Sequence, residues 1–432
     1  TAALLLGTAI LAAACGGGKE EAGGPSSQPQ NQTPETKVEE KKKEPITLSL
    51  YAPGVSVDEY NRRWKPSLEQ KFPHITFKYM TSGTGNSIQD LVARGEIPDL
   101  FRIDIPTIRT NYLDMGLAYD LRPLIQQYKY DMSRFNPVFT QEIVDVIGTG
   151  AVYGLPVPPY FPQVMYYNVD LFDKFGVPYP KDGMTIDEVY ELAKTMTRTD
   201  GGTQYRGFSS NVMAFLRDNP YSHPILDPKV DGLHGQDRWK DLFEILKKFY
   251  DIPNNKIESN TTNENNAFSK GNVAMQINQH NIYLIIPEEV NWDYATAPLL
   301  PGAPKMMGQR GPAYWAITNQ SKHKEEAFEV IMQMLSDEVQ MEDSRQGIPT
   351  TLNSKEIMDA LGKDHPIYSK KNMKAITTFP PIPPTPKRDP NLVDLALSRQ
   401  QNIMASQFIK AAQGQVDINT ALREADEILK KE

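Results

Sequence analysis

Cysteine is almost absent from this sequence, and its single Cys15 cannot form an intramolecular disulfide. The folded part must therefore be stabilised by apolar packing, for which a hydrophobic content of 39% over 432 residues is sufficient. Since domains commonly contain about 100 to 200 residues, this length allows two or three of them.

An excess of positive charge is also lacking. The 46 lysines and arginines are outnumbered by 54 aspartates and glutamates, which gives a formal net charge of −8. Because a nucleic-acid partner requires a clustered basic face, we expect no nucleic acid among the partners.

Motifs of catalysis and metal binding are missing as well. No G-x-S-x-G sequence is present, and the six histidines do not have the spacing of metal ligands. We therefore expect no catalytic residue, no cofactor and no metal site. The many carboxylates leave a glycosidase pair open as an alternative.

The first residues, TAALLLGTAILAAA, are apolar or small and end at Cys15. This run is shorter than the roughly 20 residues that span a bilayer, and it is typical of a secretory signal. Its ending on cysteine resembles a bacterial lipoprotein signal, so we expect residues 1–15 to be a signal peptide ending at a lipidated Cys15. An ordinary signal with an incidental cysteine is the alternative.

A polar segment without aromatic residues follows the signal. Over residues 16–44 its only branched aliphatic residue is Val38, too little apolar surface for a packed core. We expect residues 16–45 to be a disordered tether with a reach of roughly 30 Å.

Strand and helix patterns alternate from residue 46 onward. Apolar alternation or β-rich composition predicts strands at residues 46–52, 75–80, 99–103, 164–168, 273–277 and 314–318. Helical spacing predicts helices over residues 57–72, from 87, from 186 and from 321, the third preceded by a Thr185–Glu188 capping box. This alternation predicts an α/β fold with mainly parallel sheets.

Several segments occur in an order that resembles a known family. They are PDLFRIDIPTIRTNYLDMGLAYDLRPLI from Pro98, VYGLPVPPYFPQVMYYNVDLFDKFGVPYP from Val152, AFSKGNVAMQINQ from Ala267, TAPLLPG from Thr296 and YWAIT from Tyr314 with the helix after it. Together they resemble bacterial extracellular solute-binding proteins of the sugar-binding type, over about residues 46–352. Ile186 stands where the family usually has tryptophan.

The resemblance implies the two-lobe fold of type II periplasmic binding proteins, with the ligand in a cleft at a hinge of several segments. We expect lobe 1 to contain residues 46–157 and 302–352, and lobe 2 residues 158–301 and 353–432. The first crossing is expected near residues 156–162 and the second near 297–302.

The implied function is substrate binding for an ABC importer: capture of a carbohydrate or oligosaccharide by lobe closure, and delivery to a membrane permease. The protein would be a monomer, held by its lipid on the extracellular face of the cell membrane. A peptide or another small polar solute is the alternative ligand, and a secreted polysaccharide-active enzyme is the alternative class.

Sugar recognition combines aromatic faces with amides and carboxylates that bind hydroxyls. Candidates are side chains of these kinds at strand ends and crossings: Tyr51, Ser82, Thr84, Asp104, Tyr160, Phe161, Gln279, His280, Tyr283, Tyr314 and Trp315. Strand alternation places Tyr314 and Trp315 on opposite faces, so we expect one in the core and one near the cleft. Trp64 and Trp239 lie in helical patterns and are expected to be packing residues.

Overall fold

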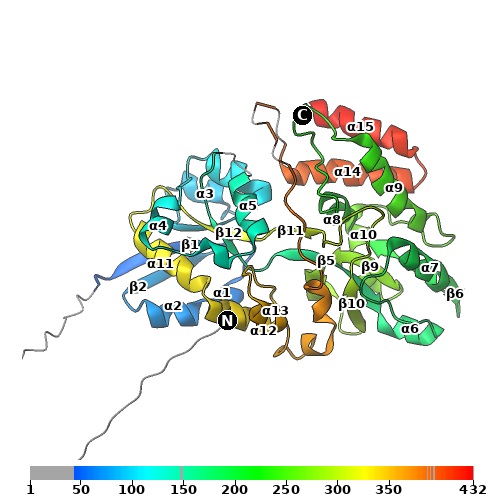
Figure 1. The fold of residues 1–432 in the computed structure, drawn as a ribbon, viewed down its shortest axis with the longest axis horizontal. Helices are drawn as coiled ribbons and strands as arrows, with labels where there is room; N and C mark the ends of the chain where they lie inside the picture. The colour runs from blue at the N-terminus through cyan, green and yellow to red at the C-terminus, as the bar shows by residue number, and fades with distance from the viewer. Residues whose placement is uncertain (1–42, 146–148, 387, 390, 393–394, 432) are drawn as a thin grey trace, which may run out of the picture. The chain divides into compact units, whose positions relative to one another are not determined.

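Two larger β-sheets, each flanked by helices, organise the chain in the computed structural model (Figure 1). The structure describes residues 43–145, 149–386, 388–389, 391–392 and 395–431. The predicted signal peptide with Cys15 and the predicted tether up to residue 42 lie outside the described residues.

The first sheet has the strand order β2-β1-β3-β12-β4. Its strands are β1 (Ile46–Tyr51), β2 (Ile75–Met80), β3 (Leu100–Asp104), β4 (Leu155–Val157) and β12 (Ala313–Ile317). β1 is parallel to β2 and β3, whereas β12 is antiparallel to β3 and β4. The strands predicted at residues 46–52, 75–80, 99–103 and 314–318 are confirmed within a residue or two.

Helices supply the apolar cover of this sheet. They are α1 (Val57–Arg63), α2 (Lys65–Lys71), α3 (Ile88–Ala93), α4 (Arg122–Gln127), α5 (Pro137–Asp145), α11 (Lys324–Met334), α12 (Asp337–Arg345) and the short α13 (Lys355–Asp359). The single helix predicted over residues 57–72 is in fact two, which meet at Trp64. Pro66, which has no N–H and clashes with the preceding turn, stands in the first turn of the new helix.

The second sheet has the order β10-β5-β9-β8. Its strands are β5 (Phe161–Asn168), β8 (Ser209–Ser210), β9 (Met275–Gln279) and β10 (Trp292–Thr296). Around it lie α6 (Val169–Phe175), α7 (Ile186–Met196), α8 (Val212–Arg217), α9 (Gln236–Tyr250), α10 (Thr261–Asn265), α14 (Leu397–Ala412) and α15 (Ile418–Lys431). A separate hairpin joins β6 (Arg198–Asp200) to β7 (Thr203–Tyr205).

The expectation of mainly parallel pairing is wrong for the second sheet. β5 is antiparallel to both β9 and β10, and only the short β8 is parallel to β9. The direction of the chain explains this, because β5 follows the segment that leaves the first sheet, whereas β10 precedes the segment that returns to it.

Local helix signals are confirmed where they were strongest. The Thr185 hydroxyl accepts from the Glu188 N–H, and the Glu188 carboxylate accepts from the Thr185 N–H, as in a capping box. Trp64 and Trp239 are fully buried, as expected of packing residues. Within the described ranges, no helix combines the length and the apolar character needed to cross a bilayer.

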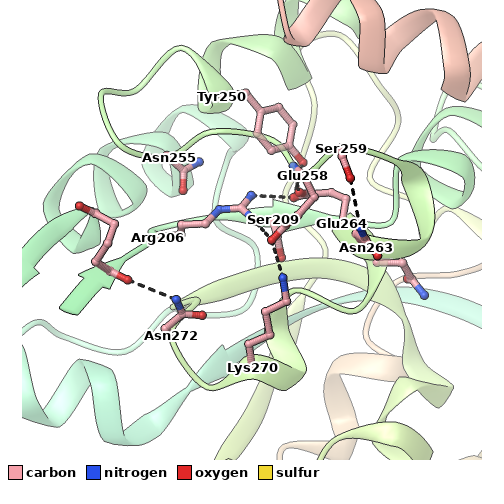
Figure 2. A network of polar contacts seen from close by, with 12 residues as sticks. Arg206, Ser209, Tyr250, Asn255, Glu258, Ser259, Asn263, Glu264, Lys270 and Asn272 are labelled. Carbon is pink, nitrogen blue, oxygen red and sulfur yellow. Dashed lines mark hydrogen bonds and ion pairs between the residues drawn. The ribbon is translucent and has the colours of Figure 1, made fainter.

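A buried group of charges lies beside the second sheet (Figure 2). The carboxylate of Glu264, on α10, accepts hydrogen bonds from the Arg206 guanidinium at 2.8 Å and the Tyr250 hydroxyl at 3.0 Å. Its other oxygen accepts from the backbone N–H of Glu258 at 2.8 Å. This network fixes the loop before α10 against the sheet.

Candidate ligand-binding site

Two chain segments run between the sheets and pair with each other. The first passes from β4 through residues 158–160 into β5, and the second leaves β10 and reaches β12 through β11 (Gln309–Arg310). β11 is antiparallel to β5, with Arg310 opposite Phe161. The start of β5, which enters the second sheet, and β11, which leads back to the first sheet, therefore lie side by side (Figure 1).

Asp104, Arg310 and Phe161 come together at this crossing. Asp104 is the last residue of β3, and its carboxylate accepts a hydrogen bond from the Arg310 guanidinium. The guanidinium carbon of Arg310 lies 5.5 Å from the centre of the Phe161 ring, within the range of a cation–π contact. The side chains of Asp104 and Arg310 remain 30% and 32% exposed, so both can reach a ligand.

The end of β9 adds two polar side chains. Gln279 lies opposite Gln163 in the β5–β9 register, and the His280 ring centre lies 6.0 Å from that of Phe161. Burial lowers the pKa of His280 to about 3, so its imidazole is neutral at physiological pH. The amide nitrogen of Gln279 is buried without a hydrogen-bond partner among the described residues. An unsatisfied donor of this kind gains free energy when a ligand oxygen reaches it.

These side chains offer the chemistry that a polyhydroxylated ligand requires. The carboxylate of Asp104 accepts hydrogen bonds, Arg310 and Gln279 donate them, and Phe161 provides an aromatic edge or face. Asp104, Phe161, Gln279 and His280 were predicted from the sequence. Contacts join Asp104 and Phe161 to Arg310 and His280 to Phe161, and Gln279 directly precedes His280 at the end of β9. Arg310 was not among the predicted site residues, although its position just before Gly311 and Pro312, at the entrance to a predicted strand, could have indicated it.

A small cavity lies beside this cluster. It measures about 20 Å³, enough for about one water molecule, and its lining includes Gln163, Phe215, Met307, Gly308 and Phe379. A sugar ring does not fit inside it. The partly exposed side chains next to the cavity are the part of the cluster that a ligand can contact.

The expectation that either Tyr314 or Trp315 faces a cleft is wrong, because both are fully buried. Alternation does send them to opposite faces of β12, but each face is covered. Trp315 belongs to the core that contains Trp64, and Tyr314 to the core that contains Tyr51. Helices on both sides of a sheet leave its inner strands no open face.

The remaining candidates lie apart from the cluster or are enclosed. Tyr51 is 2% exposed and its hydroxyl donates to the Asn86 carbonyl, while Tyr160 is 6% exposed and packs on Phe139. Ser82 and Thr84 are exposed in the loop after β2. The backbone of Tyr283 lies in a 3-10 helix, and its side chain lies outside what the structure describes.

Two sheets with helical cover, joined by paired crossing strands that carry polar and aromatic side chains, define a two-lobe binding protein. The chain belongs to the bacterial extracellular solute-binding protein family, whose sequence pattern matches residues 56–341. The family recognised from the sequence and the two-lobe α/β fold are thereby confirmed. The family consists of extracellular binding proteins, which places this chain among binders and not among enzymes.

Solved structures share this fold at low sequence identity. A sugar transporter protein of Rhizobium etli in an open conformation has a TM-score of 0.68 and 19% identity, over 90% of this chain and 100% of that one. An ABC substrate-binding protein of Listeria monocytogenes in complex with cycloalternan has a TM-score of 0.69 and 20% identity, over 90% and 99%.

A curated relative matches a shorter stretch. An uncharacterized ABC transporter extracellular-binding protein of Pyrococcus horikoshii is 26% identical over 134 residues, which are 30% of this chain and 29% of that protein. The match thus spans less than a third of the curated relative.

Proposed function

We propose that this protein captures a carbohydrate or oligosaccharide outside the cell and delivers it to the membrane permease of an ABC importer. The main support is the cluster of Asp104, Arg310, Phe161, Gln279 and His280 at the crossing of a solute-binding fold. The similar Rhizobium etli protein is described as a sugar transporter, which agrees with this ligand class, and the Listeria protein was solved in complex with cycloalternan.

The proposal includes the lobes and their movement. Lobe 1 contains residues 46–157 and 302–352, and lobe 2 contains residues 158–301 and 353–432. A ligand that contacts Asp104 from one lobe and Gln279 from the other binds both only when the lobes are close, and so favours closure. The protein acts as a monomer, and the closed form docks on the permease.

The first test is a search for the ligand by thermal unfolding. We expect one group of neutral mono- or oligosaccharides to raise the melting temperature, because a ligand at 100 times its Kd adds about 2.7 kcal/mol of stability. If only peptides raise the melting temperature, the ligand is a peptide and not a carbohydrate. If a product is released during incubation, the protein is an enzyme and not a binding protein. A second test then measures the affinity of a Phe161→Ala variant for the sugar so found.

Loss of this aromatic ring should weaken binding by about 2 kcal/mol, roughly 30-fold in Kd by calorimetry. Tyr179→Ala is a matched control, since Tyr179 is a 43% exposed aromatic side chain between α6 and α7. Equal Kd values for the two variants would remove Phe161 from the ligand site.

We also propose that Cys15 carries the lipid that holds the protein on the extracellular face of the cell membrane. The sequence supports this, because the apolar run ends at the only cysteine of the chain. Replacement of Cys15 by serine should release the protein into the medium, and mass spectrometry of the wild-type N-terminus should find a diacylglyceryl group on Cys15. A mature protein that begins at another residue would contradict the anchor.

A further inference from the structure

Two glycines, Gly308 and Gly311, flank the crossing strand β11, and each lies close to a residue of a different neighbouring segment. A Cβ atom at Gly308 would lie 2.2 Å from the backbone oxygen of Asp218, which follows α8. A Cβ atom at Gly311 would lie 2.1 Å from a carboxyl oxygen of Glu142, on α5. At Gly308 the neighbour is backbone, so no side chain fits there. At Gly311 the neighbour is the end of the Glu142 side chain, which lies directly against the glycine.

Glu142 also contacts the strand that follows the crossing. Its Oε2 lies 2.6 Å from the Tyr314 hydroxyl, and the same hydroxyl lies 3.0 Å from the backbone carbonyl of Phe139. A tyrosine hydroxyl has one proton, which can fully satisfy only one of the two acceptors. If Glu142 is protonated, it donates to the Tyr314 oxygen, Tyr314 donates to Phe139, and both contacts are satisfied.

We propose that Glu142 holds a proton while it packs against Gly311 and Tyr314, and that loss of this proton loosens the crossing segment. The segment carries Arg310, so loosening displaces Arg310 from Asp104 and Phe161. The effect on solute capture rests on the proposed function, whereas the proton on Glu142 does not.

The charges that face Glu142 agree with this assignment. Burial is the main cause that raises its pKa, and the Asp218 carboxylate adds to it. The Tyr314 hydrogen bond and the Arg310 guanidinium act in the opposite direction. Together they bring the pKa of Glu142 to about 7 from an ordinary value of 4.5.

The sign of the pH dependence follows from this raised pKa. A proton that binds more tightly in the packed conformation favours that conformation most strongly below pH 4.5, where Glu142 is protonated with or without the contact. The advantage is lost progressively as the pH rises to about 7. Above that value the carboxylate is ionised in both states, and the packed conformation is at its weakest.

Infrared spectroscopy can detect the proton without any ligand. A protonated-carboxyl band should titrate near neutral pH in the wild type and be absent from Glu142→Gln. The proposal is overturned if no such band exists, or if it persists in Glu142→Gln.

Hydrogen exchange can test the loosening. At each pH, the protection of amides in residues 308–313 is compared between the wild type and Glu142→Gln, so that the intrinsic exchange rate cancels. Between about pH 5.5 and 7.5 the wild type should lose protection roughly tenfold relative to the variant, since one pKa unit corresponds to a factor of about ten.

Glu329→Gln is the matched control, because Glu329 also accepts a hydrogen bond from a tyrosine, Tyr128, at 3.3 Å. In Glu329→Gln the protection of the amides in residues 308–313 should equal that of the wild type at every pH. A constant ratio between wild type and Glu142→Gln would show that Glu142 is a structural contact without a proton linkage.

Discussion

Replacement of Trp315 by alanine should destabilise the protein by about 3 to 5 kcal/mol, the usual cost of removing a large aromatic side chain from a packed core. Trp315 is 0% exposed and its ring meets Trp64 edge-on, with centroids 5.4 Å apart. It lies on β12, which pairs with both β3 and β4. Urea unfolding of the variant measures the loss directly.

The affinity of the folded fraction should stay nearly unchanged, because the Trp315 side chain faces the core that contains Trp64 and not the crossing. Trp315→Phe is the companion variant. It keeps most of the apolar volume, so it should lose clearly less stability than Trp315→Ala. A Trp315→Ala protein of normal stability with a Kd more than about tenfold higher would return Trp315 to the ligand site.

The secondary structure was largely predictable because its signals are local. The capping box at Thr185 and Glu188 needs four consecutive residues, and the buried stripe of α11 needs three turns. The break of the first helix at Trp64 was missed although Pro66 is visible in the sequence. Pro is tolerated in the first turn of a helix, so it marks a start as readily as an end.

The candidate site could be predicted in part, because residues at strand ends collect at one edge of a sheet. This reasoning selected Asp104 at the end of β3 and Gln279 at the end of β9. It missed Arg310, the partner of Asp104. Arg310 is held at the site by its pairing opposite Phe161, a residue almost 150 positions away in the sequence. A pairing of this kind depends on the path of the crossing segments, which no local pattern encodes.

Burial was the harder quantity to predict. Alternation correctly places Tyr314 and Trp315 on opposite faces of one strand, but it does not reveal whether helices cover both faces. Apolar runs such as AYWAI are typical of strands covered on both sides, and all five residues of β12 are buried. The composition of the strand was therefore a better indicator than its alternation.

Replacement of Glu264 by glutamine should cost about 3 kcal/mol or more, because it leaves the buried Arg206 guanidinium with the more distant Glu258 carboxylate, 3.7 Å away, in place of Glu264 at 2.8 Å. Glu264 is 0% exposed, and the Arg206 side chain is only 10% exposed (Figure 2). Glutamine preserves the shape of the side chain, so a loss measured by urea unfolding reports the charge and not a cavity.

Two further variants distinguish a charge effect from a packing effect. Arg206→Met combined with Glu264→Gln removes both charges, and should be more stable than Glu264→Gln alone. Glu244→Gln should cost less than about 1 kcal/mol, since Glu244 pairs with the half-exposed Lys240 at the surface. If the double variant is no more stable than Glu264→Gln, the weakened pairing of Arg206 is not the cause of the loss.

The same network reaches the candidate site through the sheet. The Gln276 amide donates to the Ser209 hydroxyl at 2.9 Å and to the Asn265 carbonyl at 3.0 Å, which ties β9 to β8 and to the end of α10. Three residues later β9 ends at Gln279. In Glu264→Gln we therefore expect α10 to loosen and ligand affinity to fall together with stability, whereas Trp315→Ala should lower stability alone.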